Sequence, residues 1–362
     1  MRNHYVDYLR GVSILIVLLI HFMFFPDTLP GFSLILKVIA GGFYGVTMFF
    51  VVSGYLITSR TLRRYGTAGA IAPREFYAMR AARIGPCLLL SLALLIGLNA
   101  AGAPAFANDE LWTRVLYAVT FRYNLYYISH GNQAGIMAWD VLWSLSIEEV
   151  FYLAFPLVCR LYRKTLLVCI LLVIVVINGP WYRHDHFLAE GNSSCVYTYL
   201  GCFDAIAIGC LTAIIAARYP ISRGRTAAWV AAGGAVLAFG SIVSFPIGYH
   251  FVIGPTCVAC GAGVYLFAVH GRTSRPAVPR PLGFALGILA GFGILSYEIY
   301  LFHGFLIELF AGLLGSSSIQ MPWPILGATF GIVLFCLSFA IHRYYAEPLG
   351  RSLRRLLGGQ RA

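Results

Sequence analysis

Charged residues are scarce in this 362-residue chain, at 11% of the sequence, whereas soluble domains carry about 25%. Hydrophobic residues make up 59%, and the mean hydropathy is +0.79. No polar stretch is long enough to form a separate soluble domain. The composition therefore predicts an all-α, polytopic membrane protein, with a single membrane-embedded domain over residues 1–348 and a basic cytoplasmic tail over 349–362.

Acidic residues are scarcer than basic ones, with 14 Asp and Glu against 26 Lys and Arg, and the formal net charge is +12. Such a charge can indicate nucleic-acid binding. Here the arginines stand in short segments between apolar runs, which is the pattern of membrane topology. We therefore predict no nucleic-acid partner. The lone Cys257-x-x-Cys260 has no second pair, so we interpret it as helix packing and predict no metal site.

Apolar runs long enough to cross a bilayer recur along the whole chain. They predict about ten transmembrane helices, near 8–25, 36–60, 81–103, 139–160, 165–181, 198–217, 227–245, 250–270, 284–312 and 323–345. A further stretch, 111–128, is ambiguous because Arg114, Arg122 and Asn124 interrupt it.

The charges of the connecting segments resolve this ambiguity. If both termini are cytoplasmic and 111–128 does not span, all the basic segments between helices fall on the inside. Counting 111–128 as a span would instead place the basic segment 160–164 outside. We therefore predict that 105–138 forms a lid or re-entrant segment on the outer face.

The first apolar helix carries three polar residues at membrane depth. Arg10 stands three residues after Asp7, close enough on a helix to pair with it. His21 follows eleven residues after Arg10, on nearly the same face and roughly 16 Å along the axis. A buried imidazole is costly, so His21 is a candidate functional residue. The alternative is a histidine satisfied by bonds between helices.

Two further segments combine charges with helical spacing. Pro73 and Glu75 predict a helix start, after which Arg80 and Arg83 share a face and could bind phosphate. Ordinary positive charge at the inner surface is the alternative. In Trp143-Ser144-Leu-Ser-Ile-Glu148-Glu149, the adjacent carboxylates point about 100° apart, so we predict that only one faces the interior. The alternative is that the buried carboxylate belongs to a structural ion pair.

Three other motifs complete the set. Ser53 and Gly54 belong to a run of small residues that allows close helix approach. Tyr300 and His303 share one face of the ninth helix with Ser296. Glu347-Pro348 predicts the end of the tenth helix at the inner face, where Glu347 could pair with an arginine.

Taken in order, these segments resemble the acyltransferase 3 family of integral-membrane acyltransferases over essentially the whole chain. Two positions depart from the family pattern: Cys202 stands where an arginine often precedes Asp204, and Ala346 where one precedes Glu347. The matching motifs are Asp7-Tyr-Leu-Arg10 with His21, Phe49-Phe50-Val-Val-Ser53-Gly54, Arg80-Ala-Ala-Arg83-Ile-Gly-Pro86, Trp143-Ser144-Leu-Ser-Ile-Glu148, Tyr300-Leu-Phe-His303 and Glu347-Pro348.

The resemblance implies O-acylation, commonly O-acetylation, of a carbohydrate, glycolipid or other hydroxyl acceptor of the cell envelope, with cytoplasmic acyl-CoA as co-substrate. It implies no permanently bound cofactor and a place in the bacterial cytoplasmic (inner) membrane. In a chain of this length we expect no appended esterase-like domain. The residues expected to act are His21 and Glu148 in catalysis, Arg10, Arg80 and Arg83 on acyl-CoA, Phe50, Ser53, Trp143, Ser144, Tyr300 and His303 on the acceptor side, and Asp7, Gly54, Pro86 and Glu347 in structural roles.

Two roles are open for His21: a general base on the acceptor hydroxyl, or a transient acyl carrier. Glu148 would orient the imidazole. No Gly-x-Ser-x-Gly elbow is present, which disfavours a serine acyl-enzyme. Intramembrane His, Glu and Arg equally suit a proton-coupled transporter or flippase of a glycan or lipid. A membrane scaffold is the third hypothesis, and it leaves Arg10, His21 and Glu148 unexplained.

Overall fold

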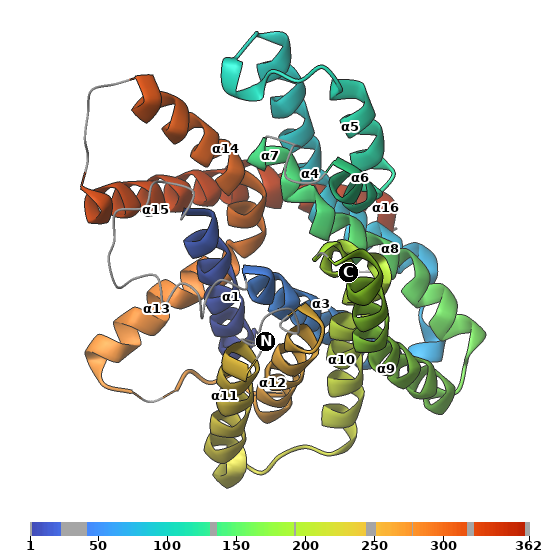
Figure 1. The fold of residues 1–362 in the computed structure, drawn as a ribbon. Helices are drawn as coiled ribbons and strands as arrows, with labels where there is room; N and C mark the ends of the chain where they lie inside the picture. The colour runs from blue at the N-terminus through green and yellow to red at the C-terminus, as the bar shows by residue number, and fades with distance from the viewer. Residues whose placement is uncertain are drawn as a thin grey trace. The chain divides into compact units, whose positions relative to one another are not determined.

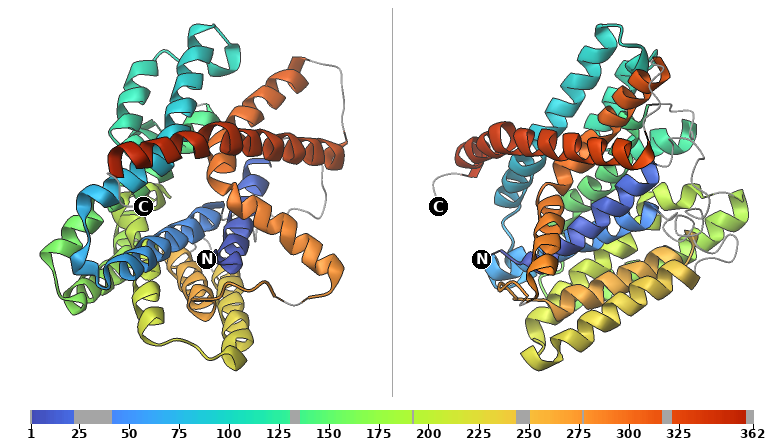
Figure 2. Two further views of the ribbon diagram at one scale, coloured as in Figure 1. Left: turned by 180° about the vertical axis from the view of Figure 1, so that it is seen from behind. Right: turned by 90° about the vertical axis from the view of Figure 1, so that its left-hand side faces the viewer.

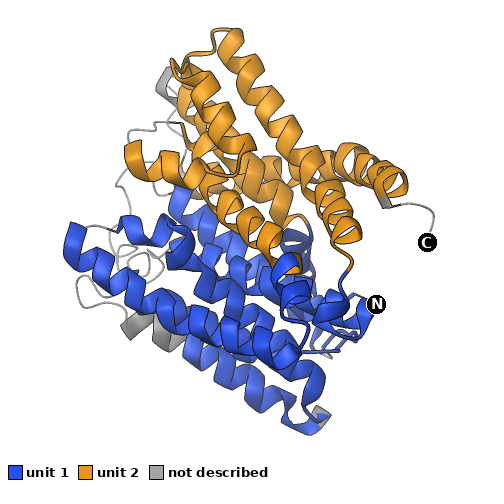
Figure 3. Cartoon of the chain, turned by 90° about the vertical axis from the view of Figure 1, so that its right-hand side faces the viewer, with its two compact units in different colours: residues 1–71, 157–294 blue, residues 72–156, 295–362 orange. Residues whose placement is uncertain are grey.

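The computed structural model describes residues 2–22, 42–130, 136–191, 193–243, 251–276, 278–316 and 322–358. These residues are helical almost throughout and contain no β-strand (Figure 1), which confirms the all-α prediction. The described chain divides into two compact units, each assembled from two stretches of sequence (Figure 3). Unit 1 comprises residues 1–71 and 157–294, and unit 2 comprises residues 72–156 and 295–362.

Among its described residues, unit 1 contains seven α-helices, which come from both of its stretches of sequence. They are α1 (His4–Phe22), α3 (Gly42–Tyr65), α9 (Thr165–Glu190), α10 (Tyr199–Arg218), α11 (Thr226–Val243), α12 (Gly254–Ala268) and α13 (Arg280–Ile294), with 3-10 turns η1 (Ala68–Ala70), η4 (Ser194–Tyr197) and η5 (Arg223–Arg225).

Unit 2 contains the remaining helices, and α8 (Leu142–Leu161) runs on from it into unit 1. They are α4 (Pro73–Ala100), η2 (Pro104–Phe106), α5 (Leu111–Val119), α6 (Tyr123–His130), α7 (Met137–Asp140), α14 (Ser296–Ser316), α15 (Trp323–Ala340), the π-helical segment η7 (Ile341–Ala346) and α16 (Glu347–Gly358).

Seven helices of the described residues are long and apolar enough to cross a membrane. An eighth candidate is the pair Arg280–Ile294 and Ser296–Leu313, which is bent by 77° at the break, and the apolar helices Thr226–Leu237 and Gly254–Ala268 are shorter. Each of the ten predicted apolar runs overlaps one of these helices, and the count of ten spans stays a prediction. So do the cytoplasmic termini and the lid near 105–138, of which residues 131–135 lie outside the described residues.

The ambiguous stretch 111–128 does not form one long helix. It contains α5 with 9 residues and most of α6, which has 8. Between them Phe121 has a φ of 54°, a left-handed conformation that interrupts the helix. Neither piece alone reaches the roughly 20 residues needed to span a bilayer.

Small residues determine how closely helices approach in unit 1. A Cβ on Gly54 of α3 would collide with the carbonyl oxygen of Ile206 in α10. A Cβ on Gly209 of α10 would likewise collide with the carbonyl oxygen of Val51 in α3. The two backbones therefore touch where each helix carries a glycine, as in other small-residue crossings in membranes.

The prediction that the tenth helix ends at Glu347-Pro348 is wrong. α15 continues through η7 into α16 and stays helical to Gly358, as Figure 2 shows. Pro348 lies in the first turn of α16, directly after a π-helical turn, where its missing N–H breaks no regular α-helical ladder. Glu347 pairs at 4.0 Å with Arg351 on its own helix, and both side chains are largely exposed.

Pro86 lies inside α4 and explains where α16 packs. A proline at this position leaves the carbonyl of Ala82, four residues earlier, without its helical donor. Gly350 of α16 lies against that carbonyl, since a Cβ on Gly350 would stand 2.6 Å from the Ala82 oxygen. The proline and the glycine together allow the C-terminal helix to pack closely on α4.

Candidate functional site

Unit 2 brings polar side chains from α4, α8, α14 and η7 together within apolar helices. We call this group the α4 arginine cluster, and it consists of Arg80, Arg83, Glu148, Tyr152, Glu298 and His342. α4 begins at Pro73 with Glu75 in its first turn, as the sequence predicted, and so carries Arg80 and Arg83 in its third turn.

Arg80 stacks its guanidinium on an aromatic ring of α8. Its Cζ lies 3.3 Å from the centroid of the Tyr152 ring, which is a close cation–π contact. The hydroxyl of Tyr152 donates a hydrogen bond of 2.8 Å to Oε1 of Glu148, one turn earlier on the same face. Glu148 therefore holds the ring, and the ring holds Arg80 by the flat face of its guanidinium.

Arg83 stands three residues after Arg80 on the same face of α4. It lies within Coulombic range of Arg80, Tyr152, Glu148 and Glu298. Two guanidinium groups thus share one small region with carboxylates from two other helices. Such an arrangement places positive charge for an anion while limiting the repulsion between the two arginines.

Glu149 is also buried, which the sequence analysis did not predict. Only 8% of its surface is exposed, whereas Glu148 is half-buried. Among the described residues, Glu149 Oε1 has no hydrogen-bond partner, and the carboxylate lies within Coulombic range of Arg80 and Glu148. The two adjacent carboxylates therefore differ in burial, and the prediction that only one of them faces the interior stays a prediction.

Ser144, Tyr300 and His303 form a second polar group in unit 2. Ser144 Oγ and Tyr300 Oη lie 2.7 Å apart and share a hydrogen bond. His303 is fully buried, and its Nδ1 lies 2.6 Å from the carbonyl oxygen of Tyr300. A carbonyl only accepts, so Nδ1 carries a proton and Nε2 is the nitrogen that can take one up. Trp143, next to Ser144, is also buried.

The remaining candidates lie in unit 1. His21 lies in the last turn of α1, and its Nδ1 lies 2.9 Å from the carbonyl oxygen of Val17. By the same reasoning Nδ1 donates, and Nε2 is the basic nitrogen. Arg10, eleven residues before His21 on the same helix, is half-buried. On α3, Phe50 is buried and Ser53 half-buried.

Asp7 has a partner that the sequence analysis missed. Its carboxylate accepts hydrogen bonds of 2.6 and 3.2 Å from Arg2, ahead of α1. The spacing had suggested Arg10 as the partner. Arg2 lies five positions before Asp7 and outside the helix. Its reach to Asp7 therefore depends on the path of the chain before α1, which helical spacing does not predict.

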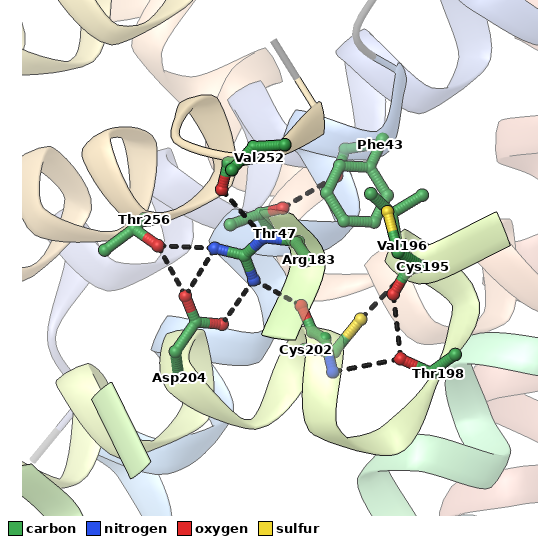
Figure 4. A network of polar contacts seen from close by, with 11 residues as sticks. Phe43, Thr47, Arg183, Cys195, Val196, Thr198, Cys202, Asp204, Val252 and Thr256 are labelled. Atoms are coloured by element: carbon green, nitrogen blue, oxygen red, sulfur yellow. Dashed lines mark hydrogen bonds and ion pairs between the residues drawn. The ribbon is translucent and has the colours of Figure 1, made fainter. Parts of the chain in front are cut away.

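Unit 1 also holds a buried ion pair that the sequence analysis did not foresee (Figure 4). The guanidinium of Arg183, on α9, donates to both carboxylate oxygens of Asp204, on α10, at 3.1 and 2.9 Å. It also donates to the carbonyls of Val252 and Gly201, and to Thr256 on α12. Thr256 in turn donates to Asp204 at 2.6 Å. We call this the Arg183 network.

The Arg183 network explains the departure at Cys202. Asp204 obtains its guanidinium from Arg183 on another helix, although no arginine stands two residues before it. Cys202 Sγ donates within its own segment, at 2.9 Å to the carbonyl of Val196. Arg183 lies just after the predicted span 165–181, and a buried aspartate without a local cation was the signal that could have led to it.

The segment 105–130 is held by its own aromatic and charged side chains. Tyr126 stacks on His130 with ring centroids 4.1 Å apart and donates a 2.6 Å hydrogen bond to Glu110. Burial and this bond raise the pKa of Tyr126. Arg114 lies over the same ring at 5.1 Å. These contacts organise 105–130 without involving the candidate residues predicted for the site.

Within the described ranges, no group of three or more His, Cys, Asp or Glu side chains could hold a metal ion. All nine cysteines are free thiols.

Comparison with known proteins gives matches over both units. The model of a family described as an acyltransferase domain matches residues 3–343. The O-acetyltransferase OatA of Staphylococcus aureus (strain NCTC 8325 / PS 47) is 30% identical over 185 residues, which cover 49% of this chain and 30% of the relative. A putative O-acetyltransferase, SACOL0978, of Staphylococcus aureus (strain COL) is 31% identical over 157 residues, 42% of this chain and 24% of the relative. The chain thus spans less than a third of these relatives' length. No solved structure matches it.

Proposed function

Because the chain belongs to the acyltransferase 3 family, we propose that it is a membrane O-acyltransferase that uses cytoplasmic acyl-CoA. The acyl group is most simply acetyl, as in the names of the O-acetyltransferase relatives. The acceptor is a hydroxyl of a carbohydrate or glycoconjugate at or across the membrane. We place the protein in a bacterial cytoplasmic membrane.

The α4 arginine cluster is the observation that carries this proposal. Arg80 uses the face of its guanidinium on Tyr152, and Nε, in the plane of the group, has no hydrogen-bond partner among the described residues. The N–H groups in that plane can therefore engage an anion. Guanidinium groups bind phosphates through paired hydrogen bonds, and coenzyme A carries several phosphates. Arg83 adds a second cation on the same face of α4.

We assign the proton transfer to His21. Its Nε2 accepts the proton of the acceptor hydroxyl while the hydroxyl oxygen attacks the thioester carbonyl. The carbon–sulfur bond then breaks, and the imidazolium returns the proton to the leaving thiolate, which gives an ester and free CoA. In the alternative path the imidazole itself carries the acyl group before the hydroxyl attacks.

We assign the other candidates by their contacts. Glu148 holds Tyr152, so its role is to position Arg80 on the donor side. Tyr300 and Ser144 present a shared hydroxyl pair that suits hydrogen bonding to a sugar. His303, whose Nδ1 is fixed by a backbone carbonyl, stabilises that pair.

The deciding experiment is thiol release from acetyl-CoA by the protein in nanodiscs, with an envelope-glycan extract as acceptor. We expect His21→Ala to abolish release that the wild type shows only with the extract. His186→Ala is the matched control, because His186 pairs with Glu190 on α9 of the same unit and should leave release unchanged. Normal release by His21→Ala would refute the assignment of His21.

The same preparation tests the transporter hypothesis. Proton-dependent uptake of a glycan or lipid into vesicles, without thiol release and without acetyl-CoA binding, would replace the acyltransferase by a transporter. Mass spectrometry of the extract after a positive reaction would identify the acceptor.

A further inference from the structure

The π-helical segment η7 places one histidine against α14. π-helical turns are rare in proteins and are frequent at functional sites. The continuous helix formed by α15, η7 and α16 contacts two other helices near this turn. His342 in η7 contacts α14, and Gly350, eight residues later in α16, contacts α4. His342 Nδ1 lies 2.7 Å from Oε1 of Glu298. A carboxylate accepts, so His342 donates this hydrogen bond.

Glu298 is fixed beside α4 by the residue that precedes it. Tyr297 donates a 3.0 Å hydrogen bond to the carbonyl of Ile84, the residue after Arg83. Glu298 itself is 5% exposed. It lies within Coulombic range of Arg83 and of Cys87, one turn further along α4. The carboxylate is thus hydrogen-bonded to the imidazole of His342 and lies within Coulombic range of the guanidinium of Arg83.

The negative charge of Glu298 acts on both the imidazole of His342 and the guanidinium of Arg83, and one carboxylate cannot fully neutralise both. If Glu298 paired with Arg83 alone, the guanidinium would be a poor ligand for a phosphate, since its charge and its donors would already be engaged. The hydrogen bond from His342 draws negative charge toward η7. Arg83 thereby keeps more of its positive charge for an incoming anion.

We propose that His342 is a positioning residue that, through Glu298, sets how strongly Arg83 binds the phosphates of the acyl-CoA donor. This inference rests on the proposed function. It adds a residue outside the motifs of the sequence analysis and gives η7 a role. It also predicts that removing the negative charge and removing the imidazole have opposite effects.

The test is a cycle of variants in nanodiscs, with acetyl-CoA affinity and steady-state kinetics as readouts. We expect His342→Ala to weaken acetyl-CoA binding and raise KM by about tenfold, the coupling typical of a partly buried charge pair, with kcat unchanged. Glu298→Gln should bind acetyl-CoA as well as the wild type or better. The double variant His342→Ala/Glu298→Gln should return to within about twofold of the wild type.

Two controls separate this mechanism from general effects. Arg343→Gln removes a positive charge from the exposed neighbour of His342 and should leave KM unchanged. Acetyl-pantetheine lacks the phosphates of CoA, so its KM should not respond to His342→Ala. A merely structural role would shift both donors alike and would not be rescued by Glu298→Gln.

Each outcome decides the proposal. Rescue in the double variant supports it, and so does weaker binding that is confined to acetyl-CoA. An equal KM for the wild type and His342→Ala would overturn the proposal. Weaker acetyl-CoA binding by Glu298→Gln would also overturn it, and this variant can still be measured if His342→Ala fails to fold. If the wild type itself binds no acetyl-CoA, the proposed function fails first.

Discussion

Two sites in this protein are built around arginines, and they differ in how far the guanidinium N–H groups are hydrogen-bonded within the protein. Arg183, in unit 1, is fully buried and donates to a carboxylate, a hydroxyl and two carbonyls. Arg80, in unit 2, meets the face of a tyrosine ring, and its Nε has no hydrogen-bond partner among the described residues. A saturated arginine holds helices together, whereas one whose donors stay available can bind a ligand.

The largest expected effect is on stability, and it comes from disrupting the Arg183 network. Arg183→Met leaves the carboxylate of Asp204 buried without its cation, which typically costs about 3–5 kcal/mol. We expect unit 1 to unfold at a markedly lower temperature, measured by thermal denaturation in detergent. Asp204→Asn in the same chain removes the uncompensated charge and should recover part of the loss. A melting temperature equal to that of the wild type would contradict a structural role.

The matching change in unit 2 should damage binding and spare the fold. Arg80→Ala removes a cation whose N–H groups are available to a ligand, so we expect weaker acetyl-CoA binding, on the order of tenfold to a hundredfold. The melting temperature should stay close to that of the wild type. Arg218→Ala, at the exposed end of α10, is the control for loss of a positive charge. Unfolding of Arg80→Ala would place Arg80 with Arg183 among the structural residues.

A finer change separates the ring of Tyr152 from its hydroxyl. Tyr152→Phe keeps the ring beneath Arg80 and removes the bond to Glu148, worth about 1 kcal/mol, so acetyl-CoA affinity should fall by about fivefold. Tyr152→Leu removes the cation–π contact as well and should weaken binding further. If the two variants bind equally, the ring contributes nothing to holding Arg80.

The contrast between the two sites also marks what the sequence could predict. The sequence correctly predicted the helical class and, from Pro73 and Glu75, the start of α4, because these depend on neighbours along one helix. It did not predict the partners of Asp204 and Glu298. Those partners, Arg183 and His342, stand 21 and 44 residues away on other helices. Periodicity gives the face of a helix, and only packing decides what that face meets.

The continuation past Pro348 could not be predicted for a similar reason. Proline is a strong signal for a helix end, and Glu347-Pro348 was interpreted in that way. The π-helical turn before it changes the hydrogen-bond pattern locally, and no residue type encodes such a turn reliably. The position of His342 depends on this turn. The sequence therefore yielded the arginines of the candidate site, while the residue proposed to tune them came only from the structure.

The smallest predicted effect concerns pH and the far end of α12 in unit 1. His270 follows α12, lies 2.8 Å from the hydroxyl of Tyr55, and has a lowered pKa because of burial and the nearby Arg63. The unfolded chain therefore binds this proton more tightly, so the contribution to stability is complete above about pH 6.5 and is lost as the pH falls through that value. We expect a small drop in melting temperature between pH 7.5 and 5.5.

His270→Asn should flatten this pH dependence, since it removes the titrating group. The Arg183 network binds the start of the same helix through Thr256. If His270 and the network stabilise α12 independently, the pH slope should be the same in wild type and in Arg183→Met/Asp204→Asn. A steeper slope in that double variant would show that the saturated network also limits opening at the other end of α12.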